Sequence, residues 1–205
     1  MSSPTTTTPP EDTGFDPVIF WIQHKSKITL LLAIFVLGLL GYGISQYLQN
    51  RKNLAAQELF AQAKSEDGYK KVIEEYPGSA AAGNALLLLA EKQRAAGKYD
   101  DSSATLHTFI DKYPDHQLIS GAWTSLAANQ EAQGKIDDAL ATYQKAFTTY
   151  PNSYSSPLAL LSQARLLQAK NKPEDARRLY EQVMTQYPDN LASQIAADAL
   201  RRIKK

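Results

Sequence analysis

The 205-residue chain contains no cysteine. This absence excludes disulfides, zinc–thiolate sites, cysteine lipid anchors and thiol nucleophiles. Histidine is scarce as well: His24, His107 and His116 are scattered, and none stands at metal-ligand spacing from another histidine or a carboxylate. The sequence also lacks a phosphate-binding glycine loop, a serine nucleophile elbow and an HExxH motif. We therefore expect no enzyme, no catalytic or metal-binding residue, no cofactor and no small-molecule substrate.

Excess charge of either sign is also missing. The chain carries 22 Lys and Arg against 21 Asp and Glu, for a net charge of +1. A nucleic-acid-binding domain needs a clear basic excess, so nucleic acid is not an expected partner. Basic residues gather only at 201–205, where they suit the negative end of a helix dipole.

What the chain does contain is a repeat with a period of 37 residues. The dipeptide Tyr-Pro occurs at Tyr76-Pro77, Tyr113-Pro114, Tyr150-Pro151 and Tyr187-Pro188. A second marker keeps the same step at Gly97, Gly134 and Asn171. Two markers in register over more than a hundred residues indicate a repeat architecture.

Each unit reads as two helices. The first helices are expected at Ser79–Ala96, His116–Gln133 and Ser153–Lys170. The second marker follows each of them and suits the left-handed residue that closes a helix, since Asn is the next best residue after Gly for that conformation. The paired carboxylates Asp100-Asp101 and Asp137-Asp138 then start the second helices. Their recurrence at one place favours a role at the positive end of the helix dipole over acid–base catalysis.

The units resemble the tetratricopeptide repeat, a helix–turn–helix unit. In the middle unit the residues at the family's pattern positions are Trp123, Leu126, Ala127, Gly134, Ala139, Tyr143, Ala146 and Pro151. The family's usual period is 34, so three extra residues lengthen either the start of the first helix or the loop before it. The expected fold class is all-α, an α-solenoid of three to four helical hairpins closed by a C-terminal capping helix at Asn190–Lys204.

An uncharged apolar run at Ile28–Leu48 predicts a transmembrane helix, because 21 helical residues span the roughly 30 Å hydrocarbon core. An uncleaved anchor is favoured over a signal peptide, since the basic residues begin only at Lys25 and the apolar run is long. The preceding aromatic stretch is either a membrane-surface helix or simply the flank of the span. The expected division of the chain is a disordered tail at 1–14, the aromatic flank at 15–27, the span at 28–48, a helical extension with a partial repeat at 49–78, and the repeats with their cap at 79–205.

A stack of such hairpins offers a concave surface lined by the first helix of each unit. The resemblance places Asn84, Leu87, Glu91, Arg94, Gly121, Thr124, Ala128, Glu131, Leu158, Leu161, Arg165 and Gln168 on it. This mixture of apolar and charged side chains suits an amphipathic peptide or helix. An ordinary solvated surface is the alternative for any one of them. Some members of the family hold a chain-end carboxylate with a Lys/Asn/Arg clamp, but the corresponding positions here are Leu87, Glu91, Thr124 and Ala128.

The arrangement of one span, a membrane-proximal half repeat and 37-residue Tyr-Pro units resembles the ancillary SecYEG translocon subunit family. That resemblance implies a bacterial inner-membrane protein with a periplasmic repeat domain, which passes newly exported chains to periplasmic chaperones. Two other functions remain open: a scaffold for cell-envelope assembly or division, and a cytoplasm-facing adaptor. The flanking charges do not decide the orientation: Lys25 and Lys27 are nearly balanced by Arg51, Lys52 and Lys64, with a slight excess that favours a cytoplasmic repeat domain.

Overall fold

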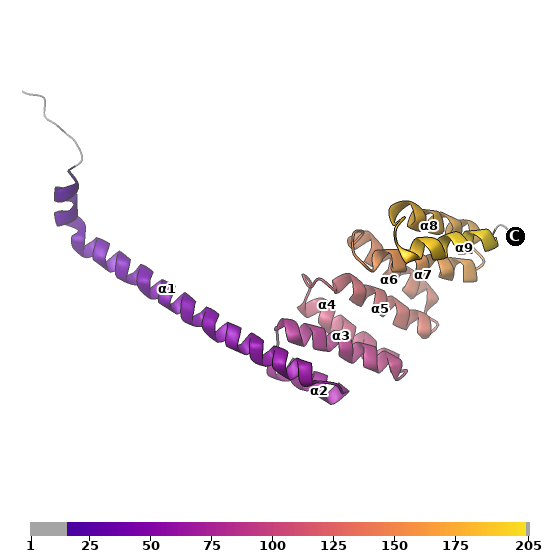
Figure 1. Cartoon of the computed structure of the whole chain (residues 1–205), viewed down its shortest axis with the longest axis horizontal. Coiled ribbons are helices and arrows are strands. Elements are labelled where there is room, and N and C mark those ends of the chain that lie inside the picture. Colours follow the sequence, from indigo (N-terminus) through magenta and orange to yellow (C-terminus); the bar gives the residue numbers. More distant parts are fainter. Residues whose placement is uncertain (1–15, 204–205) are drawn as a thin grey trace, which may run out of the picture. The chain divides into compact units, whose positions relative to one another are not determined.

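The computed structural model describes residues 16–203, and within that range the chain folds into nine α-helices and no strand (Figure 1). The all-α expectation is therefore confirmed for the described residues. The tail expected at 1–14 lies outside them. The chain divides into two compact units, Met1–Asn50 and Arg51–Lys205.

Helix α1 runs without interruption from Pro17 to Gln62. Asp16 starts it, because its carboxylate accepts hydrogen bonds from the backbone N–H groups of Val18 at 2.8 Å and Ile19 at 3.3 Å. The aromatic flank and the apolar run thus form one continuous helix. An 18-residue window of α1 has a mean hydropathy of 2.3 and no buried residue, which by length and composition fits a membrane span or a signal sequence.

The second unit is a row of helical hairpins (Figure 1). Its helices are α2 (Glu66–Glu75), α3 (Ala80–Ala95), α4 (Tyr99–Lys112), α5 (Ile119–Ala132), α6 (Ile136–Thr149), α7 (Ser156–Ala169), α8 (Pro173–Gln186) and α9 (Leu191–Ile203). Three hairpins follow one another as α3/α4, α5/α6 and α7/α8, with α2 before them and α9 after them. The predicted solenoid with a C-terminal capping helix is confirmed.

The turns inside the hairpins have the left-handed backbone that the second marker predicts. Gly97 and Gly134 have φ angles of 75°, and Asn171 has 58°. In the first hairpin, the N–H of Lys98 donates to the carbonyl of Gln93 at 2.9 Å, and the other two hairpins repeat this bond at 2.9 Å. Each turn therefore satisfies a carbonyl left free at the end of the first helix.

Two first helices begin three residues later than the sequence predicts. Helix α5 begins at Ile119, because the residues from Pro114 to Leu118 form turns in which the ring nitrogen Nδ1 of His116 accepts the N–H of Leu118 at 3.1 Å. Helix α7 begins at Ser156, whose hydroxyl donates to the carbonyl of Tyr150. In these units the structure puts the additional residues in the loop before the first helix.

Small residues let the two helices of each hairpin cross closely. Ser102, Ala139 and Ala176 occupy one repeat position, and all three are buried. Ser102 donates its hydroxyl to the carbonyl of Ala90 at 2.8 Å, so this polar side chain is hydrogen-bonded within the core. Its burial therefore leaves no unpaired donor.

Two tyrosines of the Tyr-Pro marker, Tyr113 and Tyr187, join neighbouring units. The hydroxyl of Tyr113 accepts the N–H of Gly78, in the loop that ends the preceding unit, at 3.1 Å. The hydroxyl of Tyr187 donates to the carbonyl of Pro151, in the corresponding loop two units later, at 2.5 Å. At these two positions the marker thus ends a helix and also bonds to the previous unit.

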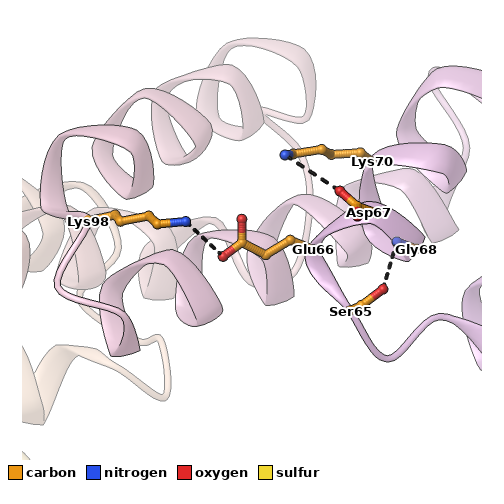
Figure 2. A network of polar contacts seen from close by, with 6 residues as sticks. All are labelled: Ser65, Glu66, Asp67, Gly68, Lys70 and Lys98. Atoms are coloured by element: carbon orange, nitrogen blue, oxygen red, sulfur yellow. Dashed lines mark hydrogen bonds and ion pairs between the residues drawn. The ribbon is translucent and has the colours of Figure 1, made fainter.

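At the N-terminal end of the row, the last turns of α1 and helix α2 cover the first hairpin. Ala56 is fully buried with Tyr69 and Val72 in a cluster that includes residues of α3. Figure 2 shows the start of α2, where the hydroxyl of Ser65 accepts the N–H of Gly68 at 3.1 Å, while Glu66 of α2 pairs with Lys98 of the first hairpin at 3.5 Å.

Candidate protein-binding groove

A pocket of about 260 Å³ lies between α3 and α5. Most of its lining is apolar, and the side chains of this kind are Leu87, Leu88, Ala90, Leu106, Leu118, Ala122 and Tyr154. Glu91 and Arg94 add one charge of each sign at its edge. We refer to it as the α3–α5 pocket.

A second pocket of about 370 Å³ lies between α5 and α7. Its lining is more polar and includes Arg94, Thr124, Ala128, Glu131, Tyr143, Leu158, Ser162 and Arg165. Arg94 and Ser125 line both pockets. The two pockets are therefore neighbours, and together they form a groove along the first helices of three successive units.

Three side chains of the α5–α7 pocket form a hydrogen-bonded set. The guanidinium of Arg165 donates to one carboxylate oxygen of Glu131 at 2.5 Å, which links α7 to α5. The hydroxyl of Tyr143 donates to the other oxygen at 3.3 Å. Burial is the main cause that raises the pKa of Tyr143, so the hydroxyl keeps its proton and remains a donor. Both oxygens of Glu131 are thus occupied.

Arg94 differs from Arg165, because no ion pair to its guanidinium is found among the described residues. Its side chain is exposed and lies where the two pockets meet. Around the α5–α7 pocket, Arg94 and Arg165 face a single carboxylate, Glu131. That pocket therefore carries one net positive charge.

Tyr154 forms part of the wall of the α3–α5 pocket, although it comes from the loop before α7. A Cβ atom placed on Gly121 of α5 would lie 1.9 Å from the Tyr154 hydroxyl oxygen. Glycine inside a helix costs about 0.5–1 kcal/mol relative to alanine. At this position it makes room for the tyrosine ring above α5.

Nine of the residues that the sequence places on the concave surface line the groove. They are Leu87, Glu91, Arg94, Gly121, Thr124, Ala128, Glu131, Leu158 and Arg165. Thr124 is only 6 % exposed and donates its hydroxyl to the carbonyl of Ser120 at 2.9 Å, so it shapes the wall but offers no free donor.

Three predicted residues lie outside both pockets. Leu161 packs against the apolar cluster formed by α7, α8 and α9. Gln168 accepts a hydrogen bond from the hydroxyl of Tyr180 at 3.2 Å. Asn84 is half-buried on α3.

Sequence reasoning found only Leu158 of a set of exposed apolar residues that we call the apolar strip. The strip consists of Tyr154, Leu158, Leu191 and Ile195, whose exposed fractions are 64 %, 53 %, 67 % and 47 %. Tyr154 and Leu191 are one period apart, as are Leu158 and Ile195, so both pairs occupy the same repeat positions in successive units. A comparison of the loop before each first helix across units would have found it.

The paired carboxylates of the sequence motif join neighbouring units. Asp100 of α4 accepts from the side-chain amide of Gln133 at 2.7 Å, and Asp137 of α6 pairs with Lys170. The hydrogen bond from Lys170 is the main cause that lowers the pKa of Asp137. Within residues 16–203, no group of three or more His, Asp and Glu side chains lies close enough together to hold a metal ion.

Comparison with known proteins agrees with this architecture. Residues 19–196 match the model of a family described as tetratricopeptide repeat-like domain. No curated protein matches the sequence significantly.

Solved structures share the fold at low sequence identity. The type III secretion translocator chaperone SycD of Yersinia enterocolitica matches with a TM-score of 0.53 and 22 % identity, over 62 % of this chain and 94 % of that one. The same chaperone in complex with a peptide of the translocator YopD matches at 0.52 and 22 %, over 62 % and 95 %. A tetratricopeptide repeat protein from Parabacteroides merdae matches at 0.54 and 15 %, over 68 % and 52 %.

Proposed function

This chain belongs to the tetratricopeptide repeat-like domain family, and from that premise we propose that it is a membrane-tethered module that binds other proteins in the groove on α3, α5 and α7. The observation that carries the proposal is the continuity of the two pockets through Arg94 and Ser125. The α3–α5 pocket, at about 260 Å³, is smaller than the usual 300–1,000 Å³ of small-molecule sites, and the α5–α7 pocket, at about 370 Å³, is near the lower end of that range. The α3–α5 pocket suits a side chain of a polypeptide, and we propose binding rather than catalysis.

The apolar part of α1 supports the tether. Its exposed window is long and apolar enough to cross a bilayer. The family match begins at residue 19 and therefore includes this part of the helix. Holding the groove near a membrane raises its effective concentration toward partners in the same membrane, so individually weak contacts suffice.

A structural neighbour supports a polypeptide as the ligand. The secretion chaperone SycD, which shares the fold at 22 % identity, has been crystallised with a peptide of its translocator partner. We propose that the present groove likewise receives a peptide segment or an amphipathic helix.

The finer proposal is a role as an accessory of the protein-export translocon in the bacterial inner membrane. In this proposal the repeats lie in the periplasm and pass newly exported chains to periplasmic chaperones. It is supported by the order of elements along the chain: one apolar helix, a half repeat, then 37-residue units that end in Tyr-Pro.

Photo-crosslinking from the groove tests the proposed function. A photoreactive amino acid replaces Leu158, which is 53 % exposed beside the α5–α7 pocket, or Lys112, an exposed residue of α4 outside both pockets. We expect translocon subunits and periplasmic chaperones to be captured from the first position and not from the second. Capture of envelope assembly or division factors alone would replace the translocon role with that of a scaffold.

Protease treatment of intact spheroplasts tests the orientation. A periplasmic repeat domain is digested from outside, whereas a domain in the cytoplasm is protected until the membrane is broken. Protection would replace the export role with that of a cytoplasm-facing adaptor.

A further inference from the structure

We propose that the groove recognises two features of its partner at once. One is an apolar side chain that enters the α3–α5 pocket against Tyr154, and the other is a carboxylate a few residues away that pairs with Arg94. This inference rests on the proposed function and specifies the chemistry of the ligand.

The apolar feature follows from the lining of the α3–α5 pocket. Its walls come from four leucines, Ala122 and the ring of Tyr154. The pocket holds the apolar part of one large side chain at most, since its volume is about 260 Å³. Removing an apolar side chain from water is favourable by about 25 cal/mol per Å² of buried surface, so this pocket provides binding energy without a specific hydrogen bond.

Gly121 indicates that the wall formed by Tyr154 is built into the structure. The absent side chain of this helical glycine leaves room for the tyrosine hydroxyl, which otherwise meets a Cβ atom at 1.9 Å. No hydrogen bond to that hydroxyl is found within the described residues. The ring is therefore positioned by packing over α5, and it stays exposed enough to contact a ligand.

The acidic feature follows from the charges of the groove. Glu131 is already paired with Arg165 and hydrogen-bonded to Tyr143, while Arg94 has no ion-pair partner among the described residues. Glu91 also lies without an ion-pair partner at the edge of the α3–α5 pocket, but it does not line the α5–α7 pocket. The site of positive charge is thus the junction of the two pockets, where Arg94 points to an acidic group of the ligand.

The apolar strip extends this surface toward the C-terminus. Leu158 lines the α5–α7 pocket, and Leu191 and Ile195 repeat the positions of Tyr154 and Leu158 on α9. Exposed apolar patches of this kind mark sites of protein interaction. We therefore place the carboxylate of the ligand between two apolar contacts, one at each side of Arg94.

A double-mutant cycle on the full chain in lipid nanodiscs tests the proposal. The probes are fluorescent twelve-residue peptides of glycine and serine that carry one phenylalanine and, three residues later, one glutamate. Matched peptides replace the glutamate by glutamine or lysine, or the phenylalanine by alanine. Wild-type protein is expected to bind the first peptide about tenfold more tightly than the glutamine peptide, as for loss of a charge-assisted hydrogen bond.

The preference for glutamate is expected to vanish in Arg94→Gln and to persist in Lys112→Gln, a matched exposed residue outside the groove. The preference for phenylalanine over alanine is expected to fall in Gly121→Ala, which displaces Tyr154 without changing a charge. Tyr154→Ala should reproduce that loss. Circular dichroism of each variant shows whether the helices remain, and Arg94 is exposed, so its replacement leaves the core intact.

Three results would overturn the inference. Survival of the glutamate preference in Arg94→Gln would show that Arg94 does not bind the ligand carboxylate. Tighter binding of the lysine peptide would assign the charge recognition to Glu91 instead. Displacement of every peptide by unlabelled full chain, with concentration-dependent dimers in sedimentation, would make a second copy of this chain the occupant. Crosslinking from Leu158 tests the proposed function separately, because it identifies the bound partners whether or not the peptides show a preference.

Discussion

At the scale of residues, two tyrosines of the Tyr-Pro marker join neighbouring units through hydrogen bonds of their hydroxyl groups. Tyr113 accepts the N–H of Gly78, and Tyr187 donates to the carbonyl of Pro151. The sequence shows the period of these tyrosines but not their partners, because the bonds join residues about one period apart. The same marker therefore stops a helix, through its proline, and ties that helix to the preceding loop, through its tyrosine.

Removing one of these hydroxyls is expected to destabilise the repeats modestly. Tyr113→Phe loses one hydrogen bond and should lower the free energy of unfolding by about 0.5–1.5 kcal/mol. Urea unfolding of the full chain in detergent, followed by circular dichroism, measures the change. Tyr150→Phe is the matched control, since this tyrosine has the same repeat position and no side-chain hydrogen bond within the described residues. Equal losses in both variants would contradict the proposed role of the hydroxyl.

His116 is expected to make the stability of the repeats depend on pH. Its Nδ1 accepts the N–H of Leu118 just before α5, and its ring packs against Phe109 with centroids 5.1 Å apart. Burial lowers the pKa of His116 below its ordinary value of 6.5. The neutral ring is thus favoured in the folded state, so its contribution to stability is present above pH 6.5 and is lost as the pH falls through the lowered pKa.

We therefore expect the urea midpoint to fall between pH 7 and pH 5, and this fall to be smaller in His116→Gln. His107→Gln serves as the control, because His107 is exposed on α4. An unchanged pH dependence in His116→Gln would show that other groups cause it.

At the scale of elements, the sequence predicted helix ends better than helix starts. The predicted ends of the first helices agree with the structure to within one residue, since a left-handed residue follows each of them: Gly97, Gly134 and Asn171. The starts of α5 and α7 were placed three residues too early. The residues before them carry no backbone constraint of comparable strength, and side-chain bonds of His116 and Ser156 decide between loop and helix.

Helix α9 covers the apolar cluster at the C-terminal end of the row of hairpins. Ala192 and Ala196 of α9 are buried against a cluster that contains Leu160 and Val183. A chain that ends at Asn190 re-exposes both larger side chains, which should cost about 3 kcal/mol at roughly 1.5 kcal/mol each. The urea midpoint of the last hairpin measures this loss.

Ile195→Ser provides the comparison within α9, because Ile195 lies on its exposed face. Surface replacements of this kind usually change stability by less than about 0.5 kcal/mol. A truncated chain as stable as Ile195→Ser would mean that α9 does not cap the solenoid.

At the scale of the whole molecule, the two compact units have separate roles in the proposed function. The repeat unit has its own apolar clusters, so we expect it to fold without the apolar part of α1. A chain without residues 1–50 is therefore expected in the soluble fraction, with the urea midpoint of the full chain. It should lose most groove crosslinks to membrane partners, because the effective concentration supplied by the tether is gone.

Fractionation of cells that express either chain, followed by crosslinking from Leu158, checks both expectations. Retention of the shortened chain in the membrane would place the membrane contact outside the apolar helix. Undiminished crosslinks would mean that the groove alone holds its partners.

The sequence by itself determined the period, the helical hairpins, the left-handed turns and the apolar run of α1. These depend on rules that act within a few residues of the chain: backbone conformation at Gly, Asn and Pro, and the spacing of apolar residues along a helix. The resemblance to the tetratricopeptide repeat also places nine of the residues that line the two pockets.

Only the tertiary structure decided which contacts those residues make. Glu131 is occupied by Arg165 from the next unit, Tyr154 stands over Gly121, and Arg94 is left without an ion-pair partner among the described residues. The first two facts depend on residues 34 and 33 positions apart in the chain, which the stacking of hairpins brings within a few ångströms. No local preference of the backbone specifies which of them meet, because that depends on packing between units.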